Sequence, residues 1–91
     1  MALTSKQKRE FRAQAHHLNP VVQTGNKGIT DALVAEIDLA LEHHELLKIR
    51  LAGAERDDRK QMTAELAERL QAEVVGSIGA VVILYRAKRD S

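Results

Sequence analysis

Apolar residues follow a helical spacing in three segments of the chain, residues 4–18, 30–45 and 58–70. In each segment they recur at intervals of three or four positions and would form one buried face. The three predicted faces consist of Phe11, Ala15 and Leu18; of Leu33, Ile37, Ala40, Leu41 and His44; and of Met62, Leu66 and Leu70.

The residues at the ends of these segments favour the same assignment. A threonine or aspartate followed three residues later by glutamine fits a capping box, and this pattern begins two segments, at Thr4 and Asp58. Thr30 is the predicted N-cap of the middle helix. Asn19 and Pro20 are predicted to end the first helix, because proline disfavours helical geometry in the residue before it.

The remaining segments have the composition of strands. Residues 20–24 form a short apolar stretch, and residues 46–51 alternate, with Leu47 and Ile49 on one side and Lys48 and Arg50 on the other. Residues 73–79 and 80–85 predict two further strands joined by a turn at residues 77–80. The last run is continuously apolar, which predicts a central strand buried on both faces.

The predicted order is therefore helix, strand, helix, strand, helix, strand, strand, within one domain spanning residues 1–91. The polar residues 87–91 are expected to form a short frayed tail. The absence of cysteine excludes disulfides and thiolate metal sites. No segment resembles a signal peptide or a membrane span, so a cytoplasmic location is the default expectation.

The net charge of +1 conceals a strong division along the chain. Residues 1–19 have a net charge of +3, residues 31–45 a net charge of −5, and residues 74–91 a net charge of +2. Such segregation predicts a basic surface that could bind nucleic acid, with the acidic helix elsewhere. The candidate phosphate-binding cations are Lys6, Lys8, Arg9, Arg12 and Lys27.

The stretch between the first strand and the second helix is the strongest candidate for a binding site. Gly25 and Gly28 flank Asn26 and Lys27, and the helix predicted to begin at Thr30 would direct its unpaired N–H groups at this loop. Glycine allows a backbone to approach a ligand closely, and a helix N-terminus attracts anions. These features suit a phosphodiester backbone. A single G-x-x-G is a weak motif, however, and a plain strand-to-helix turn would also explain it.

Other chemistry finds little support. No catalytic triad, P-loop or H-E-x-x-H motif is present, so no enzymatic activity is expected. His16 and His17 would point about 100° apart on a helix, so we expect no metal site there. The aromatic residues are Phe11 and Tyr85, both in predicted core positions. RNA binding would therefore depend on phosphate contacts and shape rather than on stacking.

Several blocks of the sequence resemble the CRM domain (chloroplast RNA splicing and ribosome maturation), in its stand-alone bacterial form, the YhbY family. The resemblance extends from residues 3–7 to residues 84–86. The blocks that carry it are Ala15-His16-His17-Leu18-Asn19-Pro20-Val21-Val22, Gly25-Asn26-Lys27-Gly28, Glu42-His43-His44-Glu45-Leu46-Leu47-Lys48, Ile78-Gly79 and Leu84-Tyr85-Arg86.

This resemblance implies an α/β two-layer sandwich with a four-stranded mixed sheet, similar to the C-terminal domain of initiation factor three, plus an N-terminal helix. It also implies an RNA-binding protein without a cofactor that assists ribosome assembly on large-subunit precursors. The G-x-x-G loop, similar to that of KH domains, would contact the RNA backbone. The alternatives are a general RNA chaperone, an adaptor that binds proteins through the acidic second helix, and an enzyme without a recognisable site.

Overall fold

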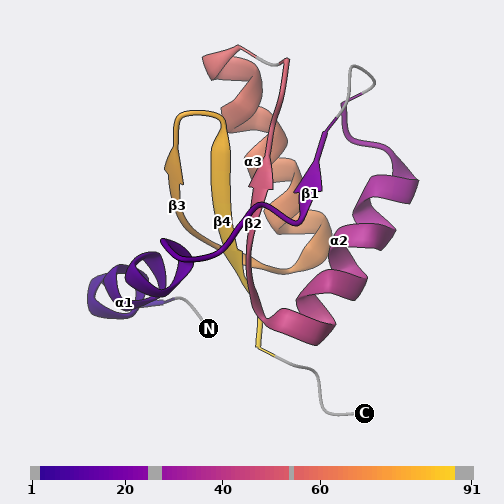
Figure 1. Ribbon diagram of the computed structural model, residues 1–91. Helices are drawn as coiled ribbons and strands as arrows, with labels where there is room; N and C mark the ends of the chain where they lie inside the picture. The colour runs from indigo at the N-terminus through magenta and orange to yellow at the C-terminus, as the bar shows by residue number, and fades with distance from the viewer. Residues whose placement is uncertain (1–2, 25–27, 54, 88–91) are drawn as a thin grey trace.

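The computed structural model describes residues 3–24, 28–53 and 55–87. Within these ranges the chain forms three helices and four strands in the predicted order (Figure 1). The elements are α1 (Ser5–Ala15), β1 (Val22–Gln23), α2 (Asp31–His44), β2 (Leu46–Arg50), α3 (Arg56–Leu70), β3 (Glu73–Ile78) and β4 (Val81–Tyr85).

The strands form a mixed sheet in the order β1-β2-β4-β3. β1 and β2 are parallel because the chain crosses between them through α2, whereas β4 is antiparallel to both β2 and β3. The prediction that the last strand is central is confirmed. The predicted hairpin is also confirmed, since β3 and β4 pair directly across a turn at Gly79 and Ala80.

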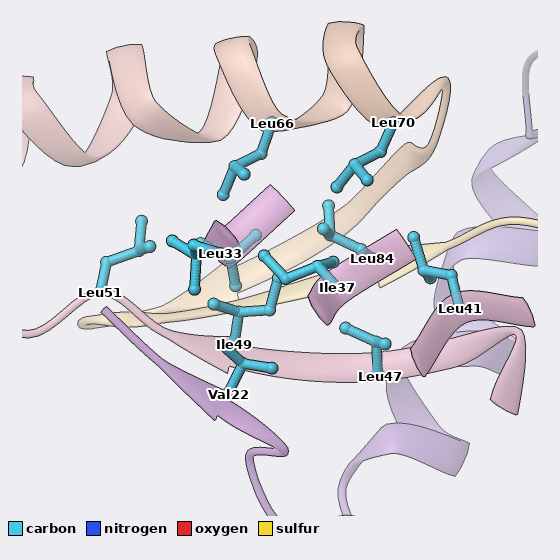
Figure 2. Close-up of a cluster of buried hydrophobic side chains, with 11 residues drawn as sticks. Val22, Leu33, Ile37, Leu41, Leu47, Ile49, Leu51, Leu66, Leu70 and Leu84 are labelled. Carbon is cyan, nitrogen blue, oxygen red and sulfur yellow. The ribbon is translucent and has the colours of Figure 1, made fainter. Parts of the chain in front are cut away.

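One face of the sheet is covered by α2 and α3, and the larger hydrophobic core lies beneath them (Figure 2). Leu47 and Ile49 of β2 point into this core, as their alternation predicts, and Leu84 of β4 joins them. The helices contribute the residues that recur at helical spacing, namely Leu33, Ile37, Leu41, Leu66 and Leu70. Every one of these side chains is buried, so this layer determines most of the stability of the fold.

Among the helices that the structure describes, α1 covers the opposite face of the sheet. A smaller buried cluster formed by Ala15, Leu46, Val75 and Ile83 lies there, with Phe11 and Tyr85 packed at its side. The rings of Phe11 and Tyr85 are stacked with their centroids 4.2 Å apart. Both aromatic residues are therefore structural, and the expected α/β sandwich with an added N-terminal helix is confirmed.

Several local predictions differ from the structure. Leu18, predicted on the buried face of the first helix, is 39% exposed because it lies beyond the end of α1. α1 ends at Ala15 rather than near Pro20, because the amides of His17 and Leu18 bond to Gln14 and Ala15 in a tighter turn. α3 begins before Asp58, with Glu55 as an N-cap that makes no side-chain hydrogen bond. His44 is exposed, although its spacing placed it on the apolar face of α2.

Candidate functional site

The residue before the predicted phosphate-binding loop is fixed to the sheet. The amide of Thr24 donates to the carbonyl of Arg50 at 2.9 Å, which ties the end of β1 to β2. Gly28 has φ of +70°, a left-handed conformation that favours glycine. A Cβ added at Gly28 would meet nothing within 4 Å, so the space beside its backbone is open. Gly25, Asn26 and Lys27 lie outside the described residues.

Thr30 caps the helix that follows. Its Oγ1 accepts a hydrogen bond of 3.1 Å from the amide of Leu33. Thr4 caps α1 in a similar way, since its Oγ1 accepts from the amide of Gln7 at 3.1 Å. Because the Thr30 hydroxyl already serves α2, the contribution of Thr30 to a ligand would come through the backbone and the dipole at the helix start.

The basic residues of α1 divide into two kinds. Lys6 and Arg9 are exposed and Lys8 is half-buried, and none of them has a carboxylate partner among the described residues. Arg12 instead donates from Nη1 to the carbonyl of Val75 at 3.2 Å. Its side chain crosses Gly76, where an added Cβ would lie 2.8 Å from Arg12 Cδ. Arg12 therefore also fastens α1 to β3.

One row of the sheet remains uncovered between α1 and the loop end of β1. Its members are paired across the strands and share the α1 side of the sheet: Gln23, Arg50, Val81 and Ile78. Arg50 is exposed, and Ile78 is 67% exposed. The row occupied by Ile83, beneath α1, lies about 7 Å away along the strands. Arg50 thus lies on the path from the α1 cations to the loop.

The structure also reveals cations that the charge count along the sequence did not select. The alternation in the sequence predicted that Lys48 and Arg50 point away from the core, and this alternation was the signal for their positions. In the structure, Lys48 Nζ donates to the carbonyl of Leu18 at 3.1 Å. Arg56, Arg59 and Lys60 lie on one side of α3, and their spacing of three and four residues is the signal in the sequence.

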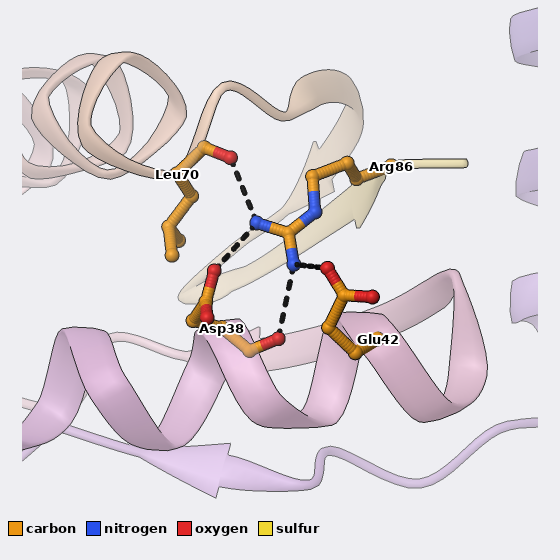
Figure 3. A network of polar contacts seen from close by, with 4 residues as sticks. All are labelled: Asp38, Glu42, Leu70 and Arg86. Carbon is orange, nitrogen blue, oxygen red and sulfur yellow. Dashed lines mark hydrogen bonds and ion pairs between the residues drawn. The ribbon is translucent and has the colours of Figure 1, made fainter. Parts of the chain in front are cut away.

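Arg86 is a structural residue. It is only 7% exposed, and its guanidinium lies between α2 and the end of α3 (Figure 3). Nη1 donates to Asp38 Oδ1 at 2.8 Å and to the carbonyl of Leu70 at 2.9 Å. Nη2 donates to Glu42 Oε1 and to the carbonyl of Asp38, both at 3.0 Å. The acidic partner of Arg86 is thus within its own chain. Lys88 and Arg89, which belong to the predicted tail, lie outside the described residues.

Arg69 is also paired. Nη2 lies 2.7 Å from Asp31 Oδ1, and Nη1 lies 3.4 Å from Glu65 Oε2. The hydrogen bond to Asp31 raises the pKa of Arg69 above its ordinary value. The acidic helix α2 therefore directs at least three of its carboxylates, those of Asp31, Asp38 and Glu42, at cations of this same chain.

Two other kinds of site find no support in the described part of the chain. No group of three histidine, aspartate or glutamate side chains is arranged to hold a metal ion there. Among the helices that the structure describes, none has the length and apolar character needed to cross a membrane.

The described part of the chain is an α/β domain with exposed cations on α1 and at one end of the sheet. The chain matches the CRS1 / YhbY (CRM) domain over residues 3–86 and belongs to this family. It is 44% identical, over 94% of its length and 83% of the relative's, to a Pseudomonas aeruginosa protein named "Probable RNA-binding protein". It is 40% identical, over 98% of its length and 90% of the relative's, to a Haemophilus influenzae protein named "RNA-binding protein".

A solved structure agrees with this assignment. A hypothetical protein from Staphylococcus aureus, described as a candidate RNA-binding protein, superimposes with a TM-score of 0.85 at 36% sequence identity. The match covers 97% of this chain and 92% of that protein. The family resemblance noted in the sequence is thus confirmed.

Proposed function

We propose that this protein binds RNA through the α1 side of its sheet and the Gly25–Gly28 loop, and that it acts without catalysis. The observation that carries the proposal is the set of α1 cations that no carboxylate of the described chain neutralises, in a family whose relatives are named as RNA-binding proteins. Lysine and arginine side chains of this kind attract phosphate groups of any sequence.

We further propose that the RNA is ribosomal RNA in precursors of the large subunit, so that the protein is a ribosome assembly factor. The family resemblance supports this assignment over a general RNA chaperone. The adaptor hypothesis has less support, because Asp38 and Glu42 of α2 bind the buried Arg86 of this same chain.

A salt titration tests RNA binding. Each lost phosphate contact lowers the slope of log K against log salt by about 0.7 to 0.9. Replacing Lys6, Lys8 and Arg9 by glutamine should therefore lower both slope and affinity, while leaving Arg12 to hold α1 on β3. An unchanged slope would exclude α1 from the RNA surface.

Sedimentation tests the ribosomal assignment. The native protein should migrate with large-subunit precursors in a density gradient at low salt and leave them at high salt. A general chaperone would bind free RNA equally well but would not be enriched in these particles. Distribution in proportion to total RNA would contradict the assembly role.

A further inference from the structure

A basic groove on the other side of the sheet has no role in the function proposed above. It lies between the first turns of α3 and the β3–β4 hairpin and has a volume of about 490 Å³. Its lining includes Arg56 and Lys60 of α3 and Val74, Ser77, Gly79 and Val82 of the hairpin.

The charges of this groove are of one sign. Arg56 and Lys60 are exposed, so their cationic ends lie at its rim, while Val82 is buried and Val74 is half-buried on its inner side. No carboxylate is found among the described residues that line it. The acidic residues of the first turn of α3, Asp57 and Asp58, are absent from this lining set.

This combination selects a particular class of ligand. Both side chains bind phosphate groups: arginine forms paired hydrogen bonds to the phosphate oxygens, and lysine acts as a point charge. Two valines on the inner side would contact a ribose or the face of a base better than they would a bare inorganic ion. The groove is therefore suited to a nucleotide segment of a nucleic acid chain.

The groove and the described residues on either side of the loop, Thr24 and Gly28, lie at the same end of the sheet. β1 and β2 finish at this end, α2 and α3 begin after them, and β3 turns into β4 there (Figure 1). Val74 and Val82 point to the α3 side, however, whereas α1 covers the opposite side. An RNA segment in the groove is thus separated from one on α1 by the β3–β4 hairpin.

We propose that the groove between α3 and the β3–β4 hairpin binds the phosphodiester backbone of a second RNA segment, distinct from the segment held by α1 and the loop. This inference rests on the proposed RNA-binding function and extends it: one domain would hold two segments of a folded RNA, or one strand that passes around the hairpin.

The test replaces Arg56 and Lys60 together by glutamine and titrates the full chain with oligouridylate of roughly 16 nucleotides at several salt concentrations. The slope for single-stranded RNA should fall by about 0.7 per contact, hence by about 1.4. The matched control, Ala35→Glu with Gln71→Glu, makes the same change in net charge on exposed positions away from the groove. It should leave the slope near that of the parent. A second variant, Arg56→Lys with Lys60→Arg, keeps both charges and should retain binding.

Amide resonances provide an independent readout. Ser77 and Gly79 line the groove, so their amide shifts should move on RNA addition in the parent and much less in the glutamine variant. A glutamine variant with the slope and shifts of the control would overturn this inference and leave the proposed function intact. A parent protein that binds no oligouridylate and no ribosomal RNA would overturn both.

Discussion

At the end of the sheet where β4 finishes, here called the closed end, the guanidinium of Arg86 is buried and held by two carboxylates and two carbonyls. At the opposite or open end, Arg50, Arg56 and Lys60 are exposed and have no carboxylate within ion-pair distance in the described chain. The same kind of charge thus serves two purposes. At the closed end it joins α2, α3 and β4, and at the open end it remains available to an external anion.

The largest effect should follow from removing the buried cation. Arg86→Met keeps the aliphatic chain but removes the guanidinium that binds Asp38 and Glu42, and breaking a buried ion pair typically costs about 3 to 5 kcal/mol. Both carboxylates are partly exposed, which favours the lower value of about 3 kcal/mol. Urea denaturation measures the loss.

The matched control is Arg50→Met, the same substitution at the open end of the sheet. An exposed site of this kind should change stability by less than about 0.5 kcal/mol. Equal destabilisation by the two variants would contradict the division between a structural and an available cation. Folded Arg86→Met protein should bind RNA as the parent does.

A smaller loss of stability is expected from Tyr85→Ala, also at the closed end. The ring is half-buried and stacked on Phe11, so its removal should cost about 2 kcal/mol, less than for a fully buried aromatic residue. Tyr85→Phe keeps the stacking and should be close to the parent in thermal melting. If Tyr85→Ala instead kept its stability and lost RNA binding, the ring would belong to the RNA surface.

The closed end could be predicted from the sequence much more fully than the open end. A helical period placed Ile37 correctly in the core and an alternating period placed Leu47 there, while the continuous apolar run of residues 80–85 predicted the burial of Leu84. The partners of Arg86 could not be predicted from the sequence, because Asp38 and Glu42 lie on α2 and no local pattern shows that α2 packs near the end of β4. The pattern did predict that Lys48 and Arg50 face away from the core.

The open end has no such periodic constraint. Cations that bind an external partner need only be exposed, so a count of charge by segment selected α1 and passed over Arg56 and Lys60, whose neighbours Asp57 and Asp58 cancel them in the sum. Helical spacing places Arg56, Arg59 and Lys60 on a different side of α3 from Asp57 and Asp58, but only the packing of α3 shows that this side faces the β3–β4 hairpin. The roles of Gly25, Asn26 and Lys27 stay predictions, since they lie outside the described residues.

The loop prediction concerns binding rather than stability. Replacing Asn26 and Lys27 by aspartate keeps both flanking glycines, so the turn should still form, but two carboxylates would face the incoming phosphates. We expect near-normal melting and an RNA affinity reduced at least about tenfold, or about 1.4 kcal/mol. Co-sedimentation with large-subunit precursors should fall in parallel. A folded variant that binds as tightly as the parent would reduce the loop to a strand-to-helix turn.

The smallest effect should come from Arg50 alone. Arg50 is exposed in the uncovered row between α1 and the loop, so Arg50→Gln should remove one phosphate contact and lower the salt slope by about 0.7 to 0.9. Gln71→Glu is the matched control, because it makes the same charge change at an exposed position beyond the end of α3, at the closed end of the sheet. Its slope should equal that of the parent. If both variants lowered the slope equally, RNA would respond only to net charge, and the uncovered row would not be a path between α1 and the loop.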